Sequence, residues 1–118
     1  MEAASRGAKR AGGLTVGILP GREPSQANHY VDIAIPTGMG ELRNGLVVAV
    51  GEVVVAVGGG YGTLSEIGLA LKGDKPVIGM QTWDLERNVE GHASIIAVAS
   101  IDEAWREVEK ALGSRDRG

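Results

Sequence analysis

A run of glycines between a β-branched segment and a helical one is the part of this sequence most able to do chemistry. The run is Gly58-Gly59-Gly60-Tyr61-Gly62; segment 52–57 precedes it, and Thr63 opens a helix expected over 63–72. Glycines let a backbone approach a ligand closely, and the first N–H groups of a helix favour an anion. The stretch therefore predicts a phosphate site to which the Thr63 hydroxyl adds a donor. A tight strand-to-helix turn without a ligand is the alternative that the same residues allow.

Glu66 follows Thr63 by three residues and has two interpretations. Its carboxylate either takes part in chemistry or closes a T-x-x-E capping box with Thr63. The glycine spacing is not G-x-G-x-x-G, and no Gly-Lys-Ser/Thr follows it, so neither a dinucleotide fingerprint nor a P-loop is predicted.

The elements that must position this turn alternate between strands and helices. We expect helices at 2–11, 41–50, 63–72 and 102–112, and strands at 14–19, 31–35, 52–57, 75–80 and 94–99. Segment 52–57 (EVVVAV) is apolar after its first residue, which is typical of a parallel strand buried on both faces. Ser100 and Glu103 are spaced as a capping box for the last helix. The pattern predicts an α/β fold, a Rossmann-like three-layer sandwich with a mostly parallel sheet.

Length and composition limit the other possibilities. The 118 residues suit a single phosphate- or nucleotide-binding domain over 1–112, followed by a frayed tail at 113–118. Without cysteine there is no disulfide or thiolate-ligated metal, and we expect no metal site. A net charge of −3 and a pI of about 5.3 argue against nucleic-acid partners. No apolar run reaches membrane-spanning length, so we expect a cytoplasmic protein without a membrane partner.

The run GGGYGTLSE is similar to the PGGxGTxxE signature of the Lonely Guy-type proteins, long mislabelled lysine decarboxylases. Arg43 lies upstream where that family places its motif arginine. The stretch 43–83 most resembles the molybdenum-cofactor carrier-like branch, and the resemblance covers essentially the whole chain. It implies a homodimer or higher homo-oligomer. Because residues 1–11 match the family's first helix, we expect a truncated frame or fragment that lacks the family's first strand.

The resemblance also implies roles for individual residues. The signature holds a nucleotide phosphate, and the glutamate and arginine, here Glu66 and Arg43, form the catalytic pair of phosphoribohydrolases. Those enzymes cleave the N-glycosidic bond of a nucleoside 5′-monophosphate and release the base and ribose 5-phosphate. The ligand-binding residues implied here are Gly58, Gly59, Gly60, Tyr61, Gly62 and Thr63.

Two departures from the hydrolase motif favour binding over hydrolysis. Asn44 follows Arg43 where the hydrolases have lysine, and Gly58 replaces the proline that opens the signature. We expect a nucleotide- or cofactor-binding carrier for a phosphorylated heterocycle, either a nucleotide or a molybdopterin-type cofactor, with no required cofactor of its own. The alternative is a nucleoside 5′-monophosphate phosphoribohydrolase, so whether the chain is an enzyme stays open. Lys72 and Lys75 are interpreted as solvated charges that complement a helix dipole, which gives no support to a decarboxylase.

The two tryptophans have mixed interpretations. Trp83 follows a strand end and either lines the ligand cleft or packs in the core. Trp105 lies on an amphipathic helix, where a core or dimer contact is favoured over a ligand contact. His29 and His92 are single loop histidines without a second ligand at metal spacing.

Overall fold

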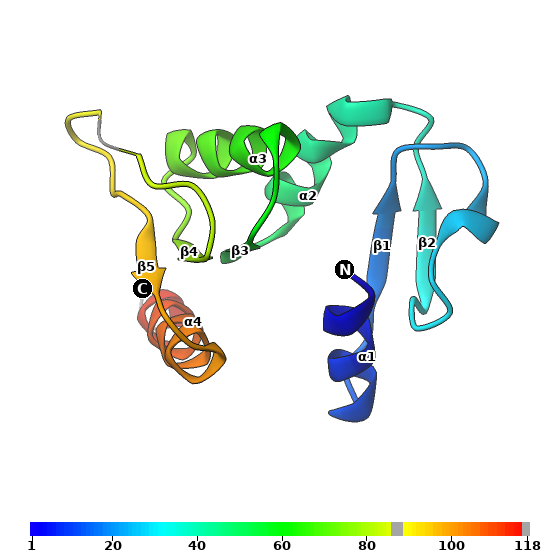
Figure 1. Cartoon of the computed structure of the whole chain (residues 1–118), viewed down its shortest axis with the longest axis horizontal. Helices are drawn as coiled ribbons and strands as arrows, with labels where there is room; N and C mark the ends of the chain where they lie inside the picture. The colour runs from blue at the N-terminus through cyan, green and yellow to red at the C-terminus, as the bar shows by residue number, and fades with distance from the viewer. Residues whose placement is uncertain (86–88, 117–118) are drawn as a thin grey trace. The chain divides into compact units, whose positions relative to one another are not determined.

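The computed structural model describes residues 1–85 and 89–116, in which two compact units are distinguished, residues 1–46 and 47–118 (Figure 1). Each unit contains a parallel sheet with helices beside it. The α/β fold with parallel strands that the sequence predicts is therefore confirmed. Within the described residues, no helix is both long enough and apolar enough to cross a membrane.

The first unit is built on two parallel strands. Its elements are α1 (Glu2–Arg10), β1 (Val16–Leu19), the 3-10 turn η1 (Pro24–Gln26), β2 (Ile33–Pro36) and the 3-10 turn η2 (Gly40–Arg43). Val16 of β1 lies opposite Ile33 of β2, and the pairing continues to Leu19 and Pro36. The helix expected over 41–50 is partly wrong, because its first turn is the tighter η2 and the α-helix begins only at Asn44.

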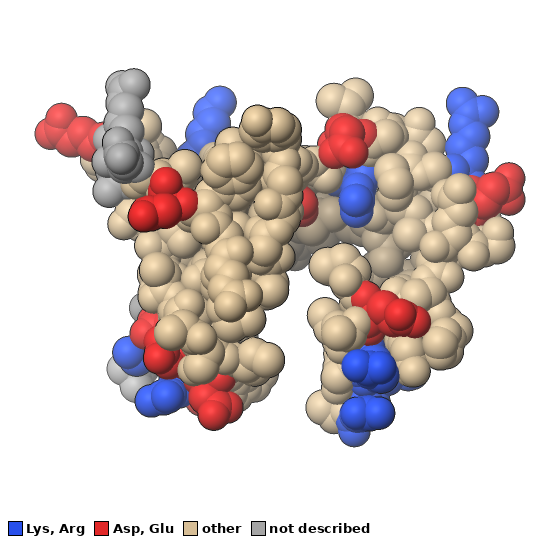
Figure 2. Space-filling model, viewed as in Figure 1, with Lys and Arg blue, Asp and Glu red and all other residues tan. Residues whose placement is uncertain are grey.

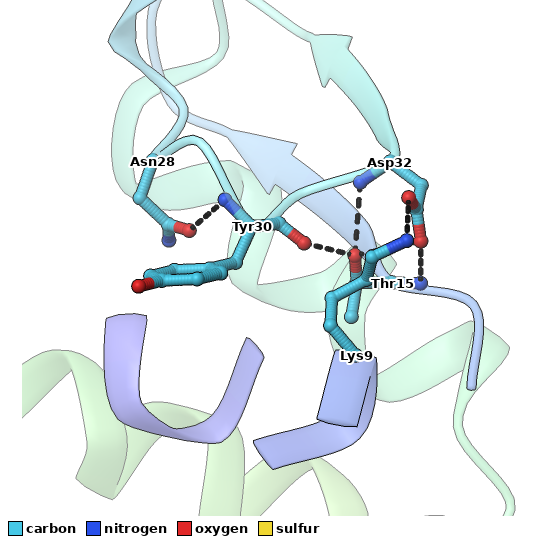
Figure 3. Close-up of polar contacts among 5 residues, drawn as sticks. All are labelled: Lys9, Thr15, Asn28, Tyr30 and Asp32. Atoms are coloured by element: carbon cyan, nitrogen blue, oxygen red, sulfur yellow. Dashed lines mark hydrogen bonds and ion pairs between the residues drawn. The ribbon is translucent and has the colours of Figure 1, made fainter. Parts of the chain in front are cut away.

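A polar cluster holds β1 and β2 in register (Figure 3). The Thr15 N–H donates to Asp32 Oδ2 at 2.9 Å, and the Asp32 N–H donates to Thr15 Oγ1 at 2.8 Å. Thr15 Oγ1 also lies 2.5 Å from the Tyr30 carbonyl oxygen, and Lys9 Nζ pairs with Asp32 Oδ1 at 2.6 Å. The hydrogen bond from Lys9, followed by the one from the Thr15 N–H, lowers the pKa of Asp32 below its ordinary value.

The second unit contains the glycine-rich turn. Its elements are β3 (Val54–Val57), α3 (Tyr61–Lys72), β4 (Val77–Met80), β5 (Ile96–Val98) and α4 (Ile101–Asp116), preceded by α2 (Asn44–Val50), which crosses the boundary between the units. The strands run parallel in the order β3-β4-β5, with Val54 opposite Val77 and Ile78 opposite Ile96. Helix α3 packs against β3 and β4, and α4 packs against β4 and β5 on the other side of the sheet (Figure 1).

The core of this unit is aliphatic and lies beneath α3. Ile67 of α3 and Ile78 of β4 are completely buried, and Val77 is 1% exposed. Strand β4, expected as a strand over 75–80, is therefore the buried central strand of this sheet. The core cluster consists of Val48, Ala56, Ile67, Ala70 and Val77.

Burial of β3 on both faces, expected from its sequence, is wrong. Val54 and Ala56 face the core, whereas Val55 and Val57 are 45% and 59% exposed. Strand β3 is the edge of its three-stranded sheet. Helix α4 packs on β4 and β5 rather than on β3, so α3 covers one face of β3 and the other face is left exposed.

The last helix is capped as predicted and is longer than predicted. The Glu103 N–H donates to Ser100 Oγ at 3.2 Å, which confirms Ser100 as the cap, and Glu103 Oε2 accepts at 3.2 Å from the Ala99 N–H, a capping box shifted by one residue on that side. Helix α4 continues through Asp116 rather than ending at 112, while 117–118 of the expected frayed tail lie outside the described residues. Trp105 on this helix is 61% exposed, so its assignment to the core is wrong, and a dimer contact stays a prediction.

Candidate ligand-binding site

The glycine-rich turn joins β3 to α3 through two left-handed residues. Gly58 has φ of +59° and Gly59 has φ of +98°, a region that L-residues with a side chain rarely adopt. A Cβ added to Gly59 would collide with the Thr63 side chain, whereas one added to Gly60 would meet no atom within 4 Å. The fold therefore requires glycine at 59, while position 60 faces open space.

Helix α3 begins at Tyr61, two residues earlier than the sequence suggests. Gly60 is the N-cap residue, and as a glycine it has no side chain with which to cap this helix. Thr63 is consequently the third residue of the helix and cannot be its N-cap, so the capping box between Thr63 and Glu66 is wrong. Glu66 lies half-buried in the second turn of α3.

Residues at the end of β4 and just after it form hydrogen bonds with the glycine-rich turn. The Gly58 N–H donates to the Met80 carbonyl at 3.1 Å, and Thr82 Oγ1 donates to the Gly58 carbonyl at 2.6 Å. Trp83 Nε1 donates to the Gly60 carbonyl at 3.0 Å. Thr82 was not identified from the sequence, since nothing in its local pattern indicates a partner 24 residues away.

Trp83 has the core-packing role that the sequence allowed, while its place in a ligand cleft stays a prediction. It packs against the core cluster, and its ring stacks with that of Tyr61 at a centroid distance of 5.7 Å and an angle of 26°. Tyr61 itself is 83% exposed at the start of α3. The indole thus connects the core, the glycine-rich turn and an exposed aromatic ring.

A pocket of about 370 Å³ lies beside Trp83, at the carboxyl end of β4 and along β5, from Ser94 before that strand to Val98 at its end. Pockets that bind small molecules measure roughly 300–1,000 Å³, and ligands of open α/β sheets bind at these strand ends. Its lining includes Gln81, Trp83, Asp84, Ser94, Ile95 and Ala97.

Arg43 and Glu66 belong to different units, so their pairing at one site stays a prediction. Within the first unit, Arg43 Nη1 donates to the Ile18 carbonyl of β1 at 2.9 Å. Its Nε is buried and has no hydrogen-bond partner among residues 1–85 and 89–116. The neighbouring Asn44 is only 4% exposed, and its Nδ2 donates to Glu41 Oε2 at 3.3 Å.

Lys75 is not the solvated charge that the sequence suggests. Its Nζ donates to the carbonyls of Val48 at 2.5 Å, Ala49 at 2.9 Å and Gly51 at 2.7 Å. These carbonyls lie at and just beyond the C-terminal end of α2, so Lys75 caps this helix rather than complementing its own neighbour α3. Lys72, in contrast, is exposed as expected.

His92 has a structural role in its loop. His92 Nδ1 lies 3.0 Å from both the Leu71 carbonyl and Asp74 Oδ1, which fastens its loop to the end of α3. Within the described ranges, no group of three or more His, Cys, Asp or Glu residues could hold a metal ion. On the face shown in Figure 2, acidic and basic side chains are interspersed without a large patch of one sign.

Comparisons with known proteins place the chain among relatives of known fold. A family model described as the SLOG cluster4 family matches residues 1–105. The solved molybdenum cofactor binding protein from the phototrophic bacterium Rippkaea orientalis is 38% identical, with a TM-score of 0.82 over 95% of this chain and 71% of that one. The molybdenum cofactor carrier protein of Chlamydomonas reinhardtii is 36% identical, with a TM-score of 0.77 over 96% of this chain and 70% of that one.

A curated relative is similar over a shorter stretch. An uncharacterised protein of Archaeoglobus fulgidus is 48% identical over 81 residues, which is 69% of this chain. The match spans about half of that relative, 53% of its length. The resemblance that the glycine signature predicts is confirmed, and the chain belongs to the SLOG cluster4 family.

Proposed function

We propose that this chain binds the phosphate of a phosphorylated heterocyclic ligand, a nucleotide or a molybdopterin-type cofactor, at the Gly58–Thr63 turn, and acts as a binding or carrier protein. The observation that carries the proposal is the open space over Gly60, where an added Cβ meets no atom within 4 Å. Gly60 precedes the first turn of α3, so a phosphate oxygen can approach the backbone there.

The residues around Gly60 suit a phosphate. The left-handed Gly58 and Gly59 bring the chain into the turn without side chains, and the N-cap residue of α3 is itself a glycine, Gly60. The helix dipole favours a negative charge at this end, and the Thr63 hydroxyl lies in the same turn of helix. Two solved relatives are named for binding or carrying the molybdenum cofactor, which supports a carrier over an enzyme. A bound cofactor would offer its phosphate to the turn, and the chain's task would be to hold it.

The proposal includes the wider expectations for the chain. We expect one ligand-binding domain over 1–112, a homodimer or higher homo-oligomer, and a cytoplasmic location. We expect neither a nucleic-acid partner nor a membrane partner.

Two glycine variants, one at the start of α3 and one within it, test the phosphate site. Gly60→Ala places a methyl group where the phosphate would lie, whereas Gly68→Ala adds the same group in open space inside α3. We expect Gly60→Ala to weaken AMP and GMP binding by about 10- to 100-fold, the equivalent of one charge-assisted hydrogen bond. Gly68→Ala should bind as the wild type does, as measured by titration calorimetry.

A second arm tests the cofactor. The wild type and both variants are purified from a host that makes molybdopterin, and the bound pterin is quantified by its fluorescence after oxidation. We expect pterin with the wild type and Gly68→Ala and little with Gly60→Ala. A wild type that binds neither nucleotide nor pterin, or a Gly60→Ala variant that binds like the wild type, would overturn the proposal.

Hydrolysis of nucleoside 5′-monophosphates is the second candidate, because Glu66 lies where the phosphoribohydrolases that the glycine signature resembles have their catalytic glutamate. In the structure Glu66 lies half-buried in the second turn of α3, which begins at Tyr61. We expect no free base from AMP, measured by chromatography with adenosine as the control. Base released from AMP but not from adenosine, and lost in Glu66→Gln, would replace the carrier with a phosphoribohydrolase.

A further inference from the structure

The pocket beside Trp83 has a chemistry of its own and shares one residue with the glycine-rich turn. Trp83 lines the pocket, and its Nε1 donates to the Gly60 carbonyl at 3.0 Å. Thr82 also lines the pocket and donates to the Gly58 carbonyl at 2.6 Å. If the phosphate of a ligand lies at Gly60, the rest of the ligand can therefore extend into this pocket.

The lining of the pocket suits a planar ring with polar edges. Trp83 and Ile95 supply apolar surface, and Gln81 and Ser94 supply neutral hydrogen-bonding groups. Asp84 is the one ionisable side chain among the lining residues that the structure describes. A carboxylate accepts hydrogen bonds only, so it disfavours a second phosphate and pairs best with two adjacent N–H donors.

We propose that this pocket binds the heterocycle of the ligand, that the ring stacks on the Trp83 indole, and that Asp84 selects rings with adjacent N–H donors on one edge. The 2-amino-4-oxopyrimidine ring of guanine and of pterins presents such an edge, with a ring N–H next to an amino group, whereas adenine does not. This inference rests on the proposed function and names the substrate class for it.

Trp83 gives the pocket its affinity for a ring. Its indole lines the pocket, while Tyr61 stacks on the indole at a centroid distance of 5.7 Å from outside the lining. Tyr61 and the hydrogen bond to the Gly60 carbonyl therefore hold the indole in place before any ligand binds. Stacking on aromatic side chains tolerates any base, so specificity must come from the hydrogen-bonding groups, above all from Asp84.

Guanosine, which has no phosphate, tests the pocket separately from the turn. The Trp105→Phe variant leaves Trp83 as the single tryptophan, so its fluorescence reports contact with the ring directly. We expect guanosine to quench this fluorescence with saturation, and adenosine to bind about 10-fold more weakly because it cannot give Asp84 two donors. The Gly60→Ala change should leave guanosine binding unaltered.

Three variants separate stacking, ring recognition and folding. Asp84 is exposed, so Asp84→Asn should fold normally and remove the preference for guanosine over adenosine. Trp83→Leu should weaken guanosine binding by about 10- to 100-fold, measured by calorimetry. Trp83→Phe keeps a ring while losing the hydrogen bond to Gly60, and it should stay within about 5-fold of the wild type.

The outcomes distinguish this inference from the proposed function. Failure of guanosine to quench Trp83, or equal binding of guanosine and adenosine by the wild type, overturns the pocket assignment. Loss of affinity in Trp83→Phe as large as in Trp83→Leu also overturns it, because the indole would then act only by holding the turn. If GMP binds no more tightly than guanosine, the phosphate turn fails while quenching by guanosine still supports the pocket.

Discussion

The strongest structural prediction concerns Lys75, whose ammonium group donates to three carbonyls at the end of α2. We consider Lys75→Met, which removes the ammonium group and keeps most of the aliphatic stem. The change leaves the carbonyls of Val48, Ala49 and Gly51 without their charged donor. Val48 belongs to the core cluster, so the end of α2 is part of the packed interior of the second unit.

The expected loss follows from the number and kind of these bonds. One hydrogen bond to a charged group contributes about 1.5–3 kcal/mol net, and a cation at a helix C-terminus contributes about 0.3–1 kcal/mol. The three bonds share one ammonium group, and the half-buried site lets water replace part of them, so the contributions do not add fully. We therefore expect Lys75→Met to lower the free energy of unfolding by about 2–4 kcal/mol.

The control is Lys72→Met, three residues away. Lys72 is exposed in the last turn of α3, and its loss should cost no more than about 0.5 kcal/mol. Both tryptophans, Trp83 and Trp105, lie in the second unit, so urea denaturation followed by tryptophan fluorescence reports the unit that contains both lysines. The midpoint should shift while the slope of the transition stays constant.

The refuting result is a Lys75→Met variant as stable as Lys72→Met. In that case the three short contacts would contribute nothing beyond an ordinary surface charge, and the end of α2 would be held by packing alone. A Lys75→Met variant that loses the transition altogether would support the reasoning only if Lys75→Arg, which keeps the charge, restores a cooperative transition.

Three further predictions concern the effect of single substitutions at Gly59, Gly68 and Asp32 on stability. Gly59→Ala should lower the free energy of unfolding by about 1–3 kcal/mol, because φ is +98° and the new Cβ meets the Thr63 side chain; urea denaturation equal to that of the wild type would contradict this. Gly68→Ala should raise it by about 0.5–1 kcal/mol, because the residue is exposed inside α3 and has open space for a methyl group; a lower midpoint would contradict it. The pKa of Asp32 lies below its ordinary 3.8 in the folded state, chiefly because of Lys9, so the stabilisation is present above pH 3.8 and lost as pH falls through the lowered value. The difference in Tm between the wild type and Asp32→Asn, followed by circular dichroism, should therefore be largest near neutral pH and shrink in acid; a difference that is constant with pH would contradict this.

Elements whose signals are local could be predicted from the sequence. The unbroken apolar run of β4 required burial, and the structure buries Val77, Ile78 and Gly79. The capping box of α4 uses two side chains three residues apart, so its hydrogen bonds depend on nothing else in the chain. The glycine signature likewise carried the family, because it lies within nine consecutive residues.

Features that depend on neighbours distant in the chain could not be predicted. The exposure of Val55 and Val57 depends on which strands α4 covers, and the sequence of β3 cannot encode that choice. The start of α3 moves to Tyr61 because Gly58 and Gly59 adopt left-handed conformations and make Gly60 the N-cap. Local sequence patterns indicate which residues are apolar and which can cap a helix. They do not indicate whether a glycine adopts the left-handed backbone conformation.

The sequence by itself therefore determined the alternation of strands and helices, the family, and the residues of the turn. The tertiary structure decided what surrounds that turn: Thr82 and Trp83 beneath it, the pocket at the ends of β4 and β5, and Lys75 on α2. Short-range patterns specify elements because hydrogen bonds within helices and caps join near neighbours. The partners of Thr82, Trp83 and Lys75 lie 23 to 27 residues away in the sequence, and only the folded sheet brings them within hydrogen-bonding distance.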